Sequence, residues 1–503
     1  MSGKTAIAAA RGASYLALQN LVCLTVQIIA FGLLARMITV TEMGLLTILT
    51  TALAAAQVVV NLGLPSIIAK LVAENNAQGK IRNGAAVFYI SFFLNVLVSL
   101  AVAALILFTR FPAGLSGMLN SNVISAITVF LALDILAAYG NMTAAAISGL
   151  QKFRDLAIFI TVFTMAKQAL ILYLVYLFHS LVGWVAATTT IDLLTTIITF
   201  AYLMKHVGPP TFNFDIKYLL KLSAPVLLSN MCLFGYYWFD RIFLIGFVDL
   251  TTLGIYGAAT QAFGAYLNLI NVLPIILIPT FAKNYAVDGR DSLGCAARSA
   301  SKYVSFTFVP IAFALLAAAR PAITIFVGLQ YEGGAFPLGE LAAFSVAAIL
   351  AYPLSSVLIV LNETKLYSLT IIPPLIAGIG VGFLTISSLG VVAMSTARGL
   401  AMAFNLVLSV ILLRRKLLVS FDMKALRNSI VASAAMALVM WLVQIVWYKP
   451  LLLPLYVFCG GVTYLVVLRV LRAVSKDDID LLSKVFGQRF GAVVRLASYV
   501  LLP

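Results

Sequence analysis

Residues 84–108 read GAAVFYISFFLNVLVSLAVAALILF, a run without a single charged side chain. A bilayer whose hydrocarbon core is about 30 Å thick needs roughly 20 apolar residues of α-helix to cross it. This run therefore predicts a transmembrane helix. Apolar segments of similar length recur along the whole chain, and short loops that carry charged residues, Pro or Gly separate them.

The composition shows that lipid, rather than water, is the main solvent. Of the 503 residues, 63% are hydrophobic and only 10% are charged, too few to cover the surface of a water-soluble domain. The apolar runs are longer than the roughly ten-residue strands of a membrane barrel and lack strict alternation. We expect an all-α polytopic membrane protein with about fourteen transmembrane helices. The expected spans are 13–35, 43–69, 84–108, 123–149, 156–178, 181–204, 222–247, 253–280, 303–325, 338–361, 366–387, 389–413, 427–447 and 451–472.

The Lys and Arg residues predict the orientation, because short basic loops resist translocation. With the N-terminus inside, nearly all of them fall in inside loops, and the outside loops hold only Arg36, Arg110, Arg320 and Lys449. We therefore expect a protein of the cell membrane with both termini in the cytoplasm. This bias also accounts for the net charge of +16, so a nucleic-acid partner is not expected.

Several kinds of chemistry are not indicated by the sequence. The four cysteines are far apart and form no CxxC pair, so neither a disulfide framework nor a metal site is expected. The chain has only two histidines and no Walker motif, and no outside loop exceeds roughly twenty residues. We expect no cofactor and no enzymatic activity, and a membrane enzyme that processes glycans ranks third among the possible functions.

A weak internal repeat has a period near 210 residues. Gly44 corresponds to Gly254, and the corner from Pro65 to Lys70 corresponds to that from Pro279 to Lys283. The repeat predicts an N-lobe of helices 1–6 at residues 1–210 and a C-lobe of helices 7–12 at 211–420. Helices 13 and 14 follow at 421–474, and an amphipathic cytoplasmic tail occupies 475–503, where Ser475 and Asp478 resemble a helix cap. The alternative is that any two hydrophobic hairpins look alike.

Two corner motifs carry a resemblance to a known family. The segment from Arg36 to Gly44, RMITVTEMG, resembles the corner R-x-L-x-P-E-x-F-G-L, although Thr or Val replaces the Pro. Asp240-Arg241, followed by LGIYGAA from Leu253, is similar to D-R-x-x-L-G … L-G-x-Y-x-x-A. These corners resemble the lipid-linked oligosaccharide flippases of the multidrug/oligosaccharidyl-lipid/polysaccharide exporter superfamily. The resemblance implies two six-helix lobes in a V around a central cavity, plus two C-terminal helices.

Charged side chains inside the spans are the candidate functional residues. An ionisable residue near the middle of a span costs about 2.5–3.5 kcal/mol on insertion scales, so it usually faces a cavity or a partner. Six such residues occur, and Arg36 lies at the outer end of the first span. The six are Asp134, Lys167, Asp192, Asp240, Arg241 and Arg398.

The cations are candidate ligands for an anionic substrate. Lys167, Arg241, Arg398 and Arg36 are suited to a phosphate, and Arg can grip it with two parallel N–H bonds. For Lys167 the alternative is an internal ion pair with Asp134 or Asp192. For Arg398 a role in the cavity is favoured over pairing with Asp240.

The acids have several possible roles. Asp134 and Asp192 are candidates for a proton or Na⁺ coupling site, for hydrogen bonds to sugar hydroxyls, or for pairing with Lys167. Asp240 and Arg241 point about 100° apart on a helix, so they do not pair with each other, and one of them can brace the lobe.

The resemblance implies a transporter that moves a polyprenyl (pyro)phosphate-linked oligosaccharide from the inner to the outer leaflet by alternating access. The expected partners are the lipid-linked glycan, membrane lipid and either H⁺ or Na⁺ as a coupling ion, and the expected state is a monomer. The closest alternative is a cation-coupled multidrug exporter of the same superfamily. Such an exporter would be expected to have an apolar or acidic cavity, so the three intramembrane cations favour the anionic substrate.

Overall fold

The computed structural model describes residues 3–109, 121–271, 273–414, 422–475 and 478. All regular secondary structure in these ranges is helical. Thirteen of the helices are long and apolar enough to cross a membrane. Arg110 and the tail from residue 479 onward lie outside the described residues, so their predicted placement stays a prediction.

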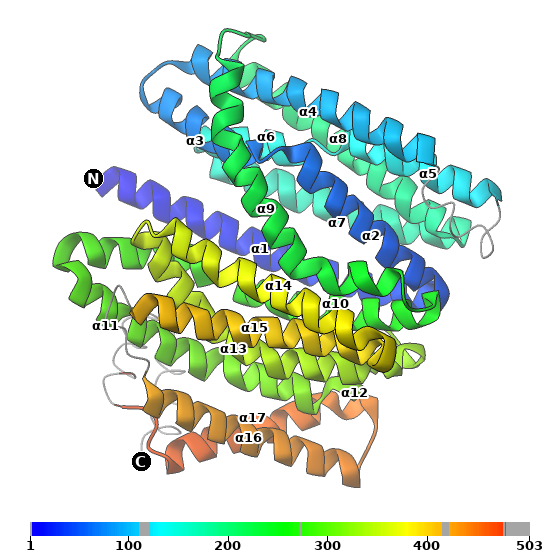
Figure 1. The fold of residues 1–503 in the computed structure, drawn as a ribbon, viewed down its shortest axis with the longest axis vertical. Helices are drawn as coiled ribbons and strands as arrows, with labels where there is room; N and C mark the ends of the chain where they lie inside the picture. Colours follow the sequence, from blue (N-terminus) through cyan, green and yellow to red (C-terminus); the bar gives the residue numbers. More distant parts are fainter. Residues whose placement is uncertain (1–2, 110–120, 272, 415–421, 476–477, 479–503) are drawn as a thin grey trace. The chain divides into compact units, whose positions relative to one another are not determined.

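The contacts divide the chain into two compact units, residues 1–242 and 243–503. The helices of the first unit (Figure 1) are α1 Gly3–Met37, α2 Val40–Asn61, α3 Leu64–Ala77, α4 Ile81–Thr109, α5 Ser121–Ala137, α6 Gly140–Gly149, α7 Phe153–Phe178, α8 Leu181–Val207 and α9 Ile216–Ile245, which ends just past the division. The predicted boundaries of the lobes at residues 210 and 420 remain predictions.

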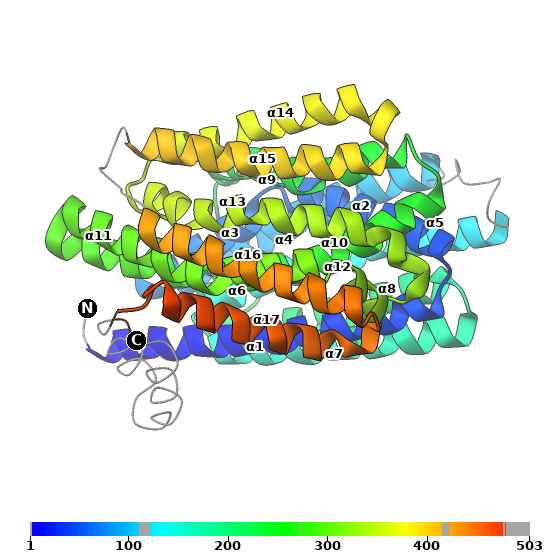
Figure 2. The ribbon, with the colours of Figure 1, turned by 90° about the horizontal axis from the view of Figure 1, so that it is seen from below.

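The helices of the second unit follow in a comparable order. They are α10 Leu250–Ile270, α11 Leu273–Ala317, α12 Ala319–Phe326, the 3₁₀ helix η2 Leu329–Gly334, α13 Ala335–Val360, α14 Thr364–Leu389, α15 Val391–Arg414, α16 Met423–Val446, η3 Pro450–Leu452 and α17 Leu453–Val470. Within this unit α13 packs on α10, α11 and α15, and α14 runs beside α15 (Figure 2). The helices α16 and α17 form a hairpin on α11.

Four spans expected to be continuous are broken in the structure, and one of them, 303–325, is divided at Ala318 between α11 and α12. The span 43–69 breaks where Leu62 and Gly63 have φ of 50° and 71°, and 123–149 breaks at Ala138 and Tyr139. The span 253–280 ends as α10 at Ile270 and resumes as α11 at Leu273. The helix α10 is not among the thirteen apolar spans, and its buried residues include Gly254, Gly257 and Thr260, which face protein, where low hydropathy is tolerated.

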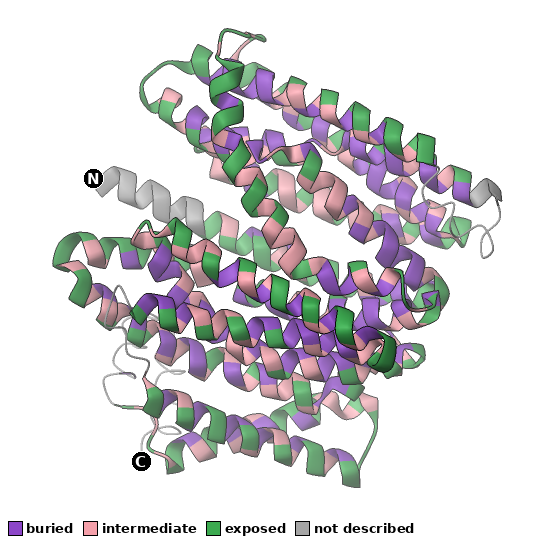
Figure 3. Ribbon diagram, in the orientation of Figure 1, coloured by how far each residue is buried: buried purple, intermediate pink, exposed green. Residues whose placement is uncertain are grey.

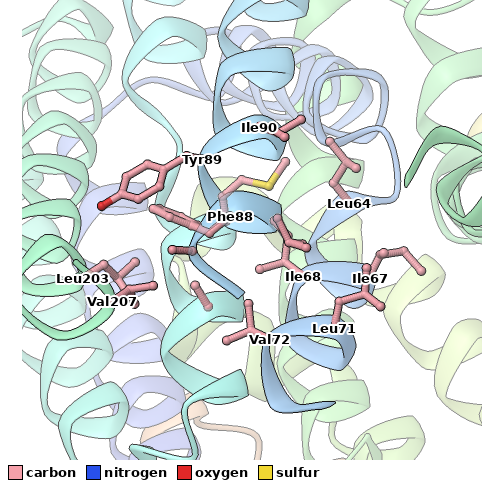
Figure 4. Packing of buried hydrophobic residues seen from close by; sticks show 14 of the residues in the cluster. Leu64, Ile67, Ile68, Leu71, Val72, Phe88, Tyr89, Ile90, Leu203 and Val207 are labelled. Atoms are coloured by element: carbon pink, nitrogen blue, oxygen red, sulfur yellow. The ribbon is translucent and has the colours of Figure 1, made fainter. Parts of the chain in front are cut away.

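Apolar packing holds the first unit together around α3, α4 and α8. Leu64, Ile68, Phe88 and Leu203 are completely buried members of one apolar cluster (Figure 4). The Tyr89 hydroxyl at the edge of this cluster donates a hydrogen bond of 2.7 Å to the carbonyl of Gly208. The contrast between buried and exposed faces is visible along the helices (Figure 3), and large apolar side chains on α7 and α14 remain exposed, as a lipid-facing surface requires.

The helix starts and turns agree with a period near 210 residues. The first residues of α2 and α10 are 40 and 250, and those of α8 and α15 are 181 and 391, so each pair differs by 210. Thr39 caps α2 in a capping box with Glu42, and Asp249 caps α10 through the amides of Thr251 and Thr252. Glu42 of the first corner motif therefore has a structural role.

The turns before α7 and α14 also share one backbone conformation. Gln151 and Asn362 have φ of 59° and 57°, and the next residues, Lys152 and Glu363, both have φ of −87° and ψ of 57°. The two units therefore repeat backbone geometry as well as helix order.

The start of the tail is tied to α11. Lys302 on α11 donates to both Asp478 carboxylate oxygens at 2.8 and 2.7 Å, and the Tyr303 hydroxyl donates to the same group at 2.8 Å. The Ser475 amide donates to Asp478 at 2.8 Å, as the predicted helix cap requires. Burial alone would raise the pKa of Asp478, but these hydrogen bonds outweigh it and lower the pKa below its ordinary value.

Candidate functional site

The first unit brings three of the predicted charged residues together on α5, α7 and α8. Lys167 Nζ lies 2.9 and 2.8 Å from the two carboxylate oxygens of Asp192. The side chains of Lys167 and Asp192 are 30% and 21% exposed, so the pair is half-buried. Of the alternatives open for Lys167, the structure shows the internal ion pair, and it identifies Asp192 as the partner.

Asp134 completes this charged cluster from the end of α5. Its carboxyl group lies beside Asp192 and Thr189 of α8 and interacts electrostatically with Lys167. Asp134 is only 2% exposed, and its Oδ1 makes no hydrogen bond to any described residue. The charged cluster, defined as Asp134, Lys167 and Asp192, therefore contains one cation and two carboxyl groups.

Threonines of α8 hold the cluster in place by bonding to the broken helix beside it. Thr189 donates to the carbonyl of Phe130 at 3.1 Å, and Thr196 donates to that of Ala137 at 2.5 Å. The carbonyl of Ala137 is at the break after α5, and a break inside a membrane frees such groups for a neighbouring side chain to satisfy. This role was not predicted from the sequence, although the runs Thr188–Thr190 and Thr195–Thr196 inside an apolar span were a visible signal.

The remaining candidate residues lie apart from the charged cluster in sequence and environment. Arg241 on α9 stacks on Trp238, with its guanidinium carbon 4.4 Å from the ring centroid, and Asp240 is completely buried. Arg398 on α15 is 5% exposed and lies 5.5 Å from the ring centroid of Phe263 on α10. Arg36 is exposed in the last turn of α1, where a cation favours the helix dipole. Their roles in substrate binding stay predictions.

A further acid of the second unit was not recognised from the sequence. Glu340, near the start of α13, accepts hydrogen bonds from the hydroxyls of Ser395 and Thr396 on α15, the helix that carries Arg398. Glu340 lies at the edge of a predicted span, so a search of span centres passes over it.

The charged cluster is suited to binding an anion or a small cation but not to holding a transition metal. In the part of the chain that the structure describes, no group of three or more His, Cys, Asp or Glu residues could hold a metal ion. The cluster can exchange a proton or a monovalent cation at its second carboxyl group, and Lys167 can exchange its carboxylate partner for a phosphate.

A family model described as polysaccharide biosynthesis protein matches residues 9–285, more than half of the chain. The chain belongs to this polysaccharide biosynthesis protein family. The resemblance inferred from the two corner motifs is thereby confirmed at the level of the family. A search of curated proteins found no match for this family member.

Solved structures show which fold this polysaccharide biosynthesis family member adopts. The lipid II flippase MurJ in an inward closed conformation is similar with a TM-score of 0.71 and 14% identity, over 91% of this chain and 98% of that chain. An inward-facing multidrug resistance MATE transporter of the MOP superfamily is similar with a TM-score of 0.60 and 14% identity, over 79% of this chain and 94% of that chain. A MOP superfamily transporter from Pyrococcus furiosus is similar with a TM-score of 0.57 and 13% identity, over 80% of this chain and 95% of that chain. The chain is thus a multi-pass membrane protein with the fold of MOP superfamily transporters.

Proposed function

We propose that this protein moves a polyprenyl (pyro)phosphate-linked oligosaccharide from the inner to the outer leaflet of the cell membrane by alternating access, without ATP. The match of residues 9–285 to the polysaccharide biosynthesis family carries this proposal. A sugar head cannot cross hydrocarbon, since each unpaired hydroxyl costs several kcal/mol. The lipid tail can stay in the bilayer while the protein carries the head.

The intramembrane cations are the proposed ligands of the lipid phosphate. Arg398 and Arg241 each lie against an aromatic ring, which favours a cation, and a guanidinium group can bind a phosphate with two parallel N–H bonds. Lys167 is a further candidate ligand when its bond to Asp192 is exchanged, and Arg36 is exposed at the end of α1.

The surplus carboxyl group of the charged cluster is the proposed coupling site. With all three groups ionised, Asp134, Lys167 and Asp192 carry a net charge of −1, and one bound H⁺ or Na⁺ brings the net charge to zero. The uptake of the ion thus removes the surplus negative charge beside Lys167, so that a phosphate can approach it, and the release of the ion restores that charge. An ion that binds one state better than the other shifts the balance between the two states by its difference in affinity.

A second candidate function is export of cationic drugs coupled to an ion. The two acids of the charged cluster outnumber its lysine, which suits a cationic substrate, and the fold is shared with multidrug resistance transporters. The cations on α9 and α15 have no evident use in such an exporter, so the flippase is preferred.

The decisive experiment is a transport assay with purified protein in liposomes. A fluorescent lipid-linked oligosaccharide is supplied on the inner side, and its appearance in the outer leaflet is measured. We expect Arg398→Ala and Lys167→Ala to slow transport about tenfold or more, because a hydrogen bond to a charged group contributes roughly 1.5–3 kcal/mol. Arg320→Ala is the control, since Arg320 is exposed on α12 and pairs with Glu332.

The outcomes separate the two candidate functions. A wild-type protein that leaves the glycan lipid in place but expels a cationic dye down an ion gradient would establish the drug exporter instead. Unchanged transport in both variants would leave the flippase standing and remove Arg398 and Lys167 from its site.

A further inference from the structure

A groove of about 470 Å³ opens on the first unit, and none of its lining residues belongs to the charged cluster. This volume is within the roughly 300–1,000 Å³ that small-molecule sites occupy. The groove is formed by α2, α3, α6 and the start of α7. It is lined by Asn61, Pro65, Ser66, Ala69, Asn141, Ala144, Ala145, Ser148 and Leu156.

Three of the polar side chains in this groove have unused hydrogen-bonding capacity. The side chains of Asn61, Ser66 and Asn141 make no hydrogen bond to any other described residue, whereas Ser148 donates to the carbonyl of Ala145 at 2.8 Å. An asparagine amide offers two N–H donors and a carbonyl acceptor, and a serine hydroxyl both donates and accepts. The groove therefore presents donors and acceptors to whatever enters it.

The lining does not suit contact with lipid tails. A lipid-facing helix surface carries large apolar side chains, as α7 and α14 do, because hydrocarbon offers no hydrogen-bond partner. Here two amides, two hydroxyls and three alanines take their place, and Leu156 is the one large aliphatic side chain of the lining. None of the nine lining residues is ionisable, so the groove does not select for charge.

We propose that this groove binds the uncharged sugar residues of the translocated glycan. An amide pair can bind neighbouring hydroxyls of a sugar ring, and the apolar side chain of Leu156 can contact the face of the ring. This inference rests on the proposed function, and it assigns the sugars to α2, α3 and α6 and the phosphate to the cations. The groove extends along α6 as far as Ser148 and includes Leu156 in α7, on either side of Lys152, which lies in a loop expected to be cytoplasmic, where the loaded lipid is received.

The first test compares the affinities of the full-length protein for two lipids. One is a polyprenyl pyrophosphate with a neutral oligosaccharide, and the other is the same lipid without sugars. We expect Asn61→Leu and Asn141→Leu each to weaken binding of the glycan lipid by about fivefold, the loss of one or two hydrogen bonds. The affinity for the bare lipid should not change, and Asn141→Gln, which keeps the amide, should restore most of the loss. Equal losses for both lipids would overturn the inference.

A second test does not depend on transport or on the leucine variants folding well. Ser66→Cys places a thiol at the exposed rim of the groove, and Gln78→Cys places a control thiol at the end of the same helix. Both are made in a chain whose four native cysteines are replaced by Ser or Ala. We expect the glycan lipid, but not the bare lipid, to slow alkylation of Cys at position 66 and to leave position 78 unaffected.

The two proposals can fail separately. A wild-type chain that transports the glycan lipid while position 66 stays unprotected would remove the groove and keep the flippase. Protection of position 66 in a chain that transports no glycan lipid would keep the groove as a sugar site and remove the flippase. Protection by the bare lipid alone would show that the groove holds lipid rather than sugar, and would overturn the inference.

Discussion

The Lys167–Asp192 pair is held in a place where a lone charge is expensive. Both groups lie near the middle of their helices, α7 and α8, and each is less than one-third exposed. Removing one partner of a fully buried pair costs about 3–5 kcal/mol, while an exposed pair contributes about 0–1 kcal/mol. A half-buried pair lies between these limits.

We therefore expect Lys167→Met or Asp192→Asn to lower the free energy of unfolding by about 2 kcal/mol, since each leaves a charge without its partner. The double variant should recover part of this loss, and the measurement is thermal unfolding in detergent. Lys70→Met is the control, because Lys70 and Glu74 form an exposed pair at 3.9 Å. Additive losses in the double variant would show that the pair contributes no coupling energy.

The sequence identified the charged residues of the first unit better than it identified their partners. Lys167 stood out because a charge inside an apolar span is rare, and its pairing with an acid of the same lobe was one of two open readings. Choosing between Asp134 and Asp192 requires the rotation of α5 and α8 about their axes, which hydropathy does not contain. Thr189 and Thr196 were missed because a threonine costs little in a membrane and so leaves no strong signal.

The hairpin of α7 and α8 depends on a close approach of its two backbones. A Cβ atom on Gly183, in the first turn of α8, would lie 2.5 Å from the carbonyl carbon and oxygen of Leu174 on α7. Atoms cannot remain at that distance, and backbone atoms cannot move aside as a flexible side chain can. The glycine therefore allows α8 to pack beside the segment of α7 that follows Lys167.

We expect Gly183→Ala to separate the hairpin, to lower the melting temperature by several degrees and to slow transport through displacement of Asp192. Gly461→Ala on α17 is the matched control, since nothing lies within 4 Å of its added Cβ and alanine is the better helix former by about 1 kcal/mol. Equal melting temperatures for the Gly183 variant and the wild type would contradict this account of the packing.

The existence of the helices was easier to predict than their breaks. Length and hydropathy were enough for most spans, because a helix in lipid must satisfy its backbone internally and present apolar side chains. The breaks after Asn61, Ala137 and Ile270 depend on contacts from other helices, such as the backbone of Leu227 only 2.6 Å from an added Cβ on Gly63. The sequence of a single span does not indicate which helix will pack against it.

For the whole molecule, the distribution of basic loops predicts which ends of the helices face the cytoplasm. We expect a thiol at Gln78→Cys, after α3, to react with an impermeant reagent only from the inside. A thiol at Leu329→Cys, which is 69% exposed in η2, should react only from the outside. The measurement is labelling of right-side-out and inverted membrane vesicles. Labelling of both positions from the same side would contradict the predicted alternation and the assignment of the termini.

The backbone features recur in both units, whereas the charged residues of the first unit do not. The caps Thr39 and Asp249 and the turns at Gln151 and Asn362 recur in both units, whereas Lys167 and Asp192 have no charged counterpart 210 residues later. The common backbone is therefore compatible with separate chemistry in each unit. This difference explains why the family could be recognised from its corner motifs while the roles of the charged residues remained open.

Lys302 and Asp478 are 176 positions apart in the sequence, so the time at which their hydrogen bond can form depends on the order of synthesis. The carboxylate leaves the ribosome only after the six membrane-crossing helices from α11 to α17 have been made. Closing so long a loop has a high entropic cost unless the intervening helices already hold its ends together. The contact therefore forms late in biogenesis. A chain that ends before residue 478 leaves Lys302 without this carboxylate. A protease acting on nascent chains can detect this difference.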